Sequence, residues 1–194
     1  GEANYYYTLF DIYKTLIEKE IVFNKGILPP WDYKNITSVG LRIGEYDWAE
    51  SFITQYNRYL PKANRQNALT YNLALLQFHR ANYKKVIELL RDVTYKDIFD
   101  GLQGRWLLLK TYYELDEFDA LDALMDSFKI FLRRNRNISK DYQQMYLNSI
   151  KYLQKIMRMP YESKANQVKL KLQIEGNKRL TERRWLLKKY DQLI

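Results

Sequence analysis

One pattern returns three times along the chain and limits what it can fold into. Each copy holds a helix-like stretch, a short turn, an aromatic residue and a second helix-like stretch. The aromatic residues are Tyr46, Tyr83 and Phe118, which lie 37 and 35 residues apart. Periods of this length are typical of repeat proteins, in which each helix pair buries its apolar face against the next pair. We therefore expect an α-solenoid rather than a sheet or a barrel.

Apolar residues recur three and four positions apart along nearly the whole chain, as one face of a helix requires. Prolines at 29, 30, 61 and 160 interrupt the pattern, because proline cannot continue a helix. The spacing predicts helices over about 6–21, 36–43, 46–59, 65–79, 82–93, 98–115, 117–134 and 139–157, and one or two more within 162–192. The prediction is an all-α fold of about nine to ten helices.

The turns inside the three copies are short, so consecutive helices should pack antiparallel. The turn sequences, each ending in the aromatic residue, are Arg42-Ile43-Gly44-Glu45-Tyr46, His79-Arg80-Ala81-Asn82-Tyr83 and Glu114-Leu115-Asp116-Glu117-Phe118. In the region after these copies, Ser139 is placed to cap a long helix. Gly176-Asn177 marks a break in the last helical region.

At these residues the chain resembles the tetratricopeptide repeat (TPR) family. Ala74 matches the small residue where the two helices of a unit cross, and Ala49 matches the small residue early in the second helix. Pro61 matches the late proline. The pattern is divergent, because Leu109 stands at a crossing position, and Val86 and Leu121 replace the early alanine.

The resemblance covers residues 31–134 and leaves 1–30 and 135–194 as flanking or capping helices. It implies a right-handed α-solenoid of antiparallel helix pairs, forming a single domain over 1–194. A non-repeating helical bundle is the alternative. The Tyr-, Lys- and Asn-rich composition favours a bacterial protein, and the first residue, Gly1, suggests a segment of a longer chain.

The resemblance also implies a function, namely that the first helix of each unit lines a concave groove that binds a peptide or a helix of a protein partner. The residues that this phasing assigns to the groove are Lys34, Arg42, Tyr71, His79, Gln103, Trp106, Lys110 and Glu114. Aromatic and cationic side chains of this kind are enriched where proteins bind one another. For each aromatic residue, ordinary core packing is the competing interpretation.

The charge distribution adds a second hypothesis. Residues 1–128 hold 15 Lys/Arg and 18 Asp/Glu, whereas residues 129–194 hold 17 Lys/Arg and 5 Asp/Glu. A basic region of this kind can bind nucleic acid, although solvated helix faces rich in Lys and Arg are the simpler explanation. The candidate basic patch consists of Arg133, Arg134, Lys178, Arg179, Arg183, Arg184 and Lys188. A third hypothesis is a homo-oligomer formed through Leu170, Ile174, Trp185 and Leu186.

Nothing in the sequence indicates catalysis, a cofactor or a metal. The chain has no cysteine and one histidine, His79, which argues against the usual zinc sites and thiol nucleophiles. Acidic residues at 116, 117, 119 and 122 match the dipole of a helix start better than a cation site. Gly101 and Gly104 mark a loose helix start or a tight helix–helix approach rather than a phosphate loop. No stretch is long and apolar enough to span a membrane, so we expect a cytoplasmic protein with no membrane partner.

Overall fold

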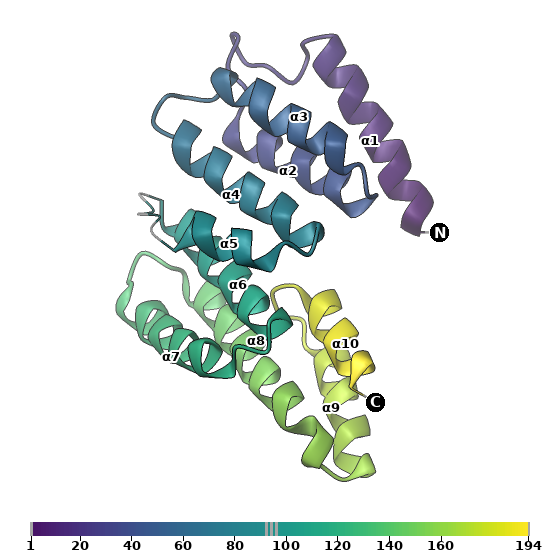
Figure 1. Ribbon diagram of the computed structural model, residues 1–194, viewed down its shortest axis with the longest axis vertical. Coiled ribbons are helices and arrows are strands. Elements are labelled where there is room, and N and C mark those ends of the chain that lie inside the picture. The colour runs from purple at the N-terminus through teal and green to yellow at the C-terminus, as the bar shows by residue number, and fades with distance from the viewer. Residues whose placement is uncertain (1, 92, 94, 96, 194) are drawn as a thin grey trace. The chain divides into compact units, whose positions relative to one another are not determined.

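The computed structural model describes residues 2–91, 93, 95 and 97–193 and folds them into ten α-helices (Figure 1). Their bounds are α1 Glu2–Glu18, α2 Pro30–Arg42, α3 Tyr46–Tyr56, α4 Arg65–His79, α5 Tyr83–Leu90, α6 Ile98–Glu114, α7 Phe118–Arg134, α8 Lys140–Arg158, α9 Lys164–Gly176 and α10 Arg183–Gln192. Within this part of the chain the only sheet-like pairing is a bridge between Asn24 and Ile27. The predicted all-α fold and its number of helices are confirmed.

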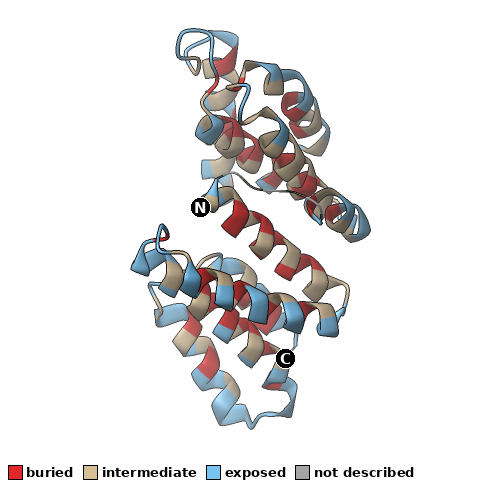
Figure 2. Ribbon diagram, turned by 90° about the vertical axis from the view of Figure 1, so that its left-hand side faces the viewer, coloured by how far each residue is buried: buried red, intermediate tan, exposed pale blue. Residues whose placement is uncertain are grey.

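The helices form two compact units, residues 1–121 and residues 122–194, and α7 crosses the boundary between them. The single domain expected over 1–194 stays a prediction. Buried residues recur along the helices, while exposed residues occupy their other sides and the turns (Figure 2). None of the helices in the described part of the chain has the length and apolarity needed to cross a bilayer.

In the first unit each helix packs against the next along the chain, from α1 to α6. In addition, α2 packs against α4 and α4 packs against α6, so the first helices of successive pairs contact one another. This is the packing order of stacked helix pairs, in which every repeat contacts its neighbours. The core between α2 and α3 contains Tyr33, Ile36, Phe52 and Ile53, all fully or almost fully buried.

The three turns share one backbone geometry. Their middle residues, Gly44, Ala81 and Asp116, all have positive φ, at 86°, 58° and 56°. In each turn the following amide donates to a carbonyl five residues earlier, as in Glu45 N to Gly40 O at 3.0 Å and Asn82 N to Gln77 O at 2.8 Å. The third copy, Glu117 N to Tyr112 O, is also 3.0 Å long. A left-handed residue with this bond ends a helix by satisfying its last carbonyls, so the repeated sequence pattern is also a repeated structure.

The residues at the crossing and early-helix positions of the TPR pattern are all buried, whether they match it or depart from it. Ala49 and Ala74 have no exposed surface, and neither do the larger Val86, Leu109 and Leu121. The positions therefore belong to the core whatever the size of the side chain. The chain differs from the TPR pattern in the size of the side chains that fill the core. A close-packed interior accepts a larger side chain only where the neighbouring side chains leave room for it.

The side chain of Tyr95 packs so closely against α6 that it explains the two glycines of that helix. A Cβ atom added at Gly104 would overlap the hydroxyl of Tyr95, and one added at Gly101 would lie 3.5 Å from the Tyr95 Cβ. Tyr95 belongs to the segment between α5 and α6, so the close approach is made by a tyrosine side chain. The close partner of these glycines is therefore a loop residue, and not a neighbouring helix as a tight helix–helix approach predicts.

In the second unit α10 packs against both α8 and α9. Ser139 accepts the amide of Tyr142 at 3.3 Å, which confirms it as the cap of α8. Farther along α8, the Ser149 hydroxyl accepts the amide of Thr181 at 3.0 Å and thereby fixes the segment before α10. The region 162–192 forms two helices, and the first ends at Gly176 as predicted.

Candidate partner-binding surface

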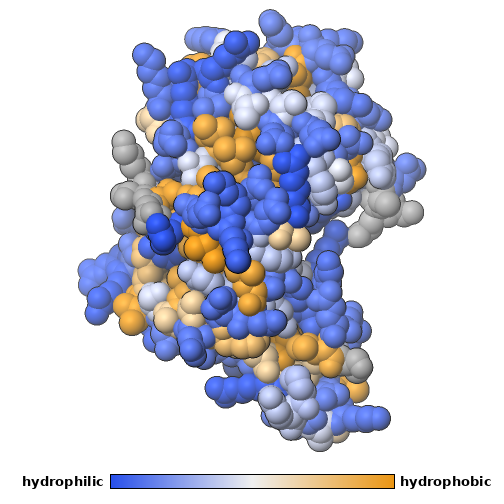
Figure 3. Space-filling model, viewed as in Figure 1, coloured by the Kyte–Doolittle hydropathy of each residue, from blue (hydrophilic) through white to orange (hydrophobic). Residues whose placement is uncertain are grey.

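The surface best suited to a partner lies on the first helices of the pairs, α2, α4 and α6. We define the first-helix face by four residues: Trp31 and Lys34 from α2, Tyr71 from α4 and Asp100 from α6. The order of helix packing places these three helices next to one another. On the side of the molecule seen in Figure 3, hydrophobic side chains are interspersed with hydrophilic ones.

Lys34 connects the three helices. Its ammonium nitrogen lies 5.7 Å from the centroid of the Trp31 ring and 5.8 Å from that of the Tyr71 ring, within the range of cation–π attraction. Burial raises the pKa of Asp100, the charge of Asp97 raises it further, and the positive charge of Lys34 opposes this rise. Lys34 therefore interacts with a ring on its own helix, a ring on α4 and a carboxylate at the start of α6.

Trp31 gives this face an exposed aromatic side chain. It is 67% exposed and sits in the first turn of α2, directly after Pro29 and Pro30. Proline is well suited to this position, because the first amides of a helix have no partner within the helix. A large exposed aromatic residue beside a cation is a common anchor in protein interfaces.

Two of the predicted groove residues lie in the interior. Trp106 is only 2% exposed and Lys110 only 5% exposed. The Lys110 ammonium nitrogen lies 4.7 Å from the centroid of the Phe78 ring, so the side chain packs along an aromatic partner from α4. Neither side chain offers surface to a partner. The reason is that α6 is enclosed on several sides, with eight buried residues along its length.

Three other predicted residues lie at the C-terminal ends of their helices. Arg42 is exposed, but its guanidinium lies 4.5 Å from the Tyr6 ring centroid and donates to the Tyr6 hydroxyl. The ring centroid of His79 is 6.3 Å from that of Tyr46, on the second helix of the preceding pair. Glu114 adds its charge to the larger effect of burial in raising the pKa of Tyr83. These residues interact with α1 or with the second helices.

Gln103 is half-buried and follows Asp100 by three residues on α6, which places both on the same side of that helix. Of the eight predicted groove residues, the structure therefore brings Lys34 and Tyr71 into direct contact and sets Gln103 near Asp100. The other five lie in the interior or at the helix ends.

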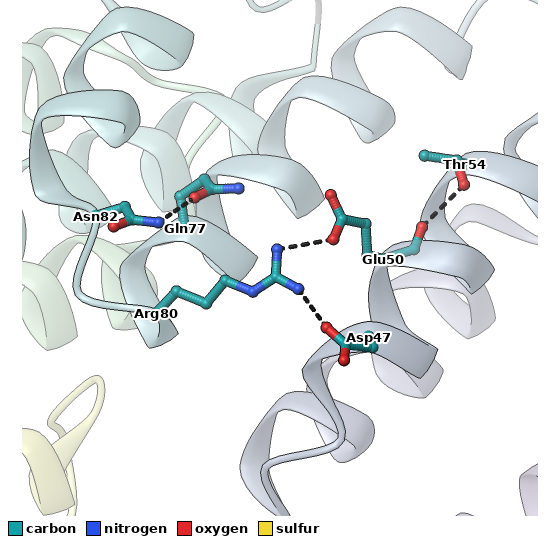
Figure 4. A network of polar contacts seen from close by, with 6 residues as sticks. All are labelled: Asp47, Glu50, Thr54, Gln77, Arg80 and Asn82. Atoms are coloured by element: carbon teal, nitrogen blue, oxygen red, sulfur yellow. Dashed lines mark hydrogen bonds and ion pairs between the residues drawn. The ribbon is translucent and has the colours of Figure 1, made fainter.

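A polar network at the turn after α4 was not predicted from the sequence (Figure 4). The Arg80 guanidinium donates to Glu50 at 2.7 Å and to Asp47 at 2.8 Å, both on α3. The hydrogen bond with Glu50 is the main cause that raises the pKa of Arg80. Next to it, the Asn82 side chain donates to Gln77 at 2.8 Å. The only signal in the sequence for this network is an arginine in the turn, Arg80, about one repeat after two acidic residues, Asp47 and Glu50.

The basic patch residues all belong to the second unit. Arg133, Arg134, Lys178, Arg179, Arg184 and Lys188 are exposed, and Arg183 is half-buried. Arg179 lies 3.3 Å from the Asp141 carboxylate at the start of α8, and Arg183 donates to the carbonyl of Asn177. The residues from 178 to 183 are thus ordered by contacts with α8 and with their own loop.

The apolar residues proposed for self-association lie mostly inside the second unit. Leu170, Ile174 and Leu186 are buried, and Trp185 is half-buried. The three buried side chains offer no surface to a second copy. The exposed apolar side chains of α9, Val168 and Leu172, lie on its opposite face.

No group of three or more acidic or histidine side chains is placed to hold a metal ion among the residues that the structure describes. No known protein family, curated protein or solved structure matches the chain. The interpretation of the surfaces therefore rests on their own geometry and chemistry.

Proposed function

We propose that this chain is a TPR-like helical repeat protein that binds a peptide or a helix of another protein on the first-helix face. The observation that carries the proposal is the position of Lys34, within cation–π distance of both the Trp31 and the Tyr71 rings and within the electrostatic reach of Asp100. Three successive first helices thus contribute to one surface of aromatic and charged side chains. Such a surface supplies apolar contact area together with orienting charges.

The ordered packing of α2, α4 and α6 further supports this function. A binding face built on packed helices is rigid, and rigidity lowers the entropy that is lost when a partner binds. A pair of carboxylates or a nucleophile beside a base would have favoured catalysis instead. The first-helix face has a cation, two rings and one carboxylate, a set suited to recognition.

Photo-crosslinking from single positions tests this proposal. A photoreactive amino acid at position 31 of the full chain should crosslink a discrete protein in an extract of the source cells. The same amino acid at position 84, an exposed site on α5, is the control and should not crosslink that protein. Equal products from both positions, or no protein product from position 31, would contradict the proposal.

A second candidate function, nucleic-acid binding, is favoured by the charge of the second unit. Residues 122–194 contain 17 Lys/Arg and 7 Asp/Glu, and six of the seven basic patch residues are exposed. Binding to phosphates through such residues weakens steeply as salt rises, because counterions are released. Titration of labelled single- and double-stranded oligonucleotides at low and physiological salt tests it, with Arg184→Ala/Lys188→Ala as the variant that should bind more weakly.

A further inference from the structure

The outer face of α9 is an apolar seam that is flanked by two lysines. Ala165, Val168 and Leu172 follow one another at spacings of three and four residues and are all exposed. Val168 and Leu172 are 59% and 63% exposed, which is unusual for two branched apolar side chains one turn apart. With about 100° between successive residues of a helix, the three fall within an arc of about 60°.

The opposite face of α9 is already occupied by its own unit. Leu170 and Ile174 are buried on that side. The Tyr190 hydroxyl of α10 donates to the carbonyl of Gln167 at 2.8 Å, and Lys171 lies 2.8 Å from the Asp191 carboxylate. These contacts fix the rotation of α9 about its axis. The seam consequently faces away from α10 and cannot turn inward without breaking them.

Lysines border the seam on both sides. Lys164 and Lys169 lie within about 40° of its two edges and are exposed. Neither makes an ion pair within the described part of the chain, whereas Lys171 is paired with Asp191. Glu175, the one acidic residue in the sequence of α9, lies about 20° outside Val168 on the Lys164 side, at the C-terminal end of the helix. The part of the seam from Lys164 to Lys169 is therefore bordered by positive charge.

We propose that this seam binds an acidic amphipathic helix of another protein. Side chains spaced three and four residues apart pack as knobs into the face of a second helix. The flanking positions then decide the partner, and lysines there favour glutamates or aspartates opposite them. The seam has only three apolar residues, so the complex is of low affinity and reversible.

Charge also argues against a second copy of this chain as the occupant. In a parallel pair Lys164 of one copy would face Lys169 of the other, which disfavours that arrangement. In any arrangement two copies bring together units of like charge, because residues 122–194 hold 17 Lys/Arg and 7 Asp/Glu. An acidic helix meets the lysines at the N-terminal part of the seam with the opposite charge.

A designed peptide provides the test. It has three heptads, with Leu at the a and d positions and Glu at the e and g positions, so that its own charges keep it monomeric. Fluorescence anisotropy with the full chain should show binding. The double variant Val168→Glu/Leu172→Glu should weaken binding at least about tenfold. Ile130→Glu, an exposed apolar site on α7 at 48% exposure, is the matched control and should leave the affinity unchanged.

Charge reversal makes the test specific. The variant Lys164→Glu/Lys169→Glu should lose the acidic peptide and gain a peptide with Lys at e and g. Circular dichroism should show that all variants keep the helical content of the parent. The proposal is overturned if the acidic peptide does not bind, or if it binds the seam variant as well as the parent.

Two further measurements separate other occupants. Self-association of the parent that is abolished by Leu172→Glu, measured by sedimentation, would identify a second copy and overturn the proposal. The parent is also tested on vesicles of phosphatidylserine and phosphatidylcholine. If it binds the vesicles more tightly than the peptide, and Val168→Glu/Leu172→Glu abolishes that binding, the occupant is a lipid surface and the proposal is overturned. Because the seam lies in residues 122–194, its failure leaves the crosslinking result at position 31 unaffected.

Discussion

At the scale of single residues, the turn positions with positive φ are the most sensitive to substitution. Gly44 and Ala81 occupy the same place in successive turns, and only Gly44 is a glycine. A Cβ added at Gly44 meets nothing within 4 Å, so any cost of Gly44→Ala comes from the backbone. We expect Gly44→Ala to lower the free energy of unfolding by about 1 kcal/mol and Ala81→Gly to raise it by about 0.5 kcal/mol. Urea unfolding measures both, and a shift of the same sign in the two variants would contradict the shared turn geometry.

Tyr33 holds the first helix pair together through its hydroxyl. The side chain is fully buried, and the hydroxyl donates to the carbonyl of Ile53 at 2.6 Å. We expect Tyr33→Phe to lower the free energy of unfolding by about 1–2 kcal/mol, because the carbonyl loses a buried partner. Urea unfolding of this variant should be compared with Tyr7→Phe, which alters an exposed tyrosine. An equal effect in both variants would argue against this hydrogen bond as a source of stability.

Buried tyrosines should make the protein sensitive to alkaline pH. Burial raises the pKa of Tyr95 to about 12, and it also raises the pKa of Tyr33 and of Tyr146. An unfolded tyrosine titrates near pH 10, so the folded state is favoured fully below about pH 10 and loses this advantage as the pH rises toward 12. We expect the free energy of unfolding to fall over that interval, and to fall less in Tyr95→Phe. Urea unfolding across this pH range measures it, and a flat profile would contradict the burial of these phenols.

At the scale of elements, the Arg80 network joins the end of α4 to α3 at little energetic gain. The Asp47 side chain is fully exposed, and Glu50 is about half exposed. Solvent-exposed ion pairs contribute about 0–1 kcal/mol, so Arg80→Ala should lower the free energy of unfolding by less than about 1 kcal/mol. The loss should shrink further at high salt. Lys85→Ala, which removes an exposed pair within α5, is the control and should have a still smaller effect.

The course of the helices could be predicted from the sequence because breakers and caps are local signals. Pro61 and Ser139 mark element ends that the structure reproduces. The predicted helix 82–93 ends earlier, at Leu90, and residue 92 lies outside the described residues. Helix ends depend on tertiary contacts as well as on local propensity, so a difference of this size is expected.

The faces of the helices were harder to predict than their bounds. In α9, apolar residues lie on both sides, with Leu170 and Ile174 inside and Val168 and Leu172 outside. When a helix has two apolar faces, the spacing of its apolar residues does not indicate which face is buried. Trp106 and Lys110 in α6 show the same problem. A shift of about one residue in the alignment to the repeat rotates a side chain by about 100°, which is enough to exchange a groove position for a core position.

At the scale of the whole molecule, the two units differ in charge and in the surfaces they offer. Residues 1–121 carry the three repeated turns and the first-helix face, and residues 122–194 carry the basic patch and the seam on α9. Each surface has its own recognition chemistry, an aromatic and charged face in one unit and lysine-rich faces in the other. We expect variants in one unit to leave the binding that we propose for the other unit unchanged.

Hydrogen–deuterium exchange of the full chain, with and without the partner identified by crosslinking, decides whether a protein partner binds the first-helix face. We predict slower exchange in α2, in α4 and in the first turns of α6, because a bound partner shields these helices, and unchanged exchange in residues 122–194. Slower exchange confined to residues 122–194, with α2 and α4 unchanged, would contradict the claim and move the binding function to the basic unit.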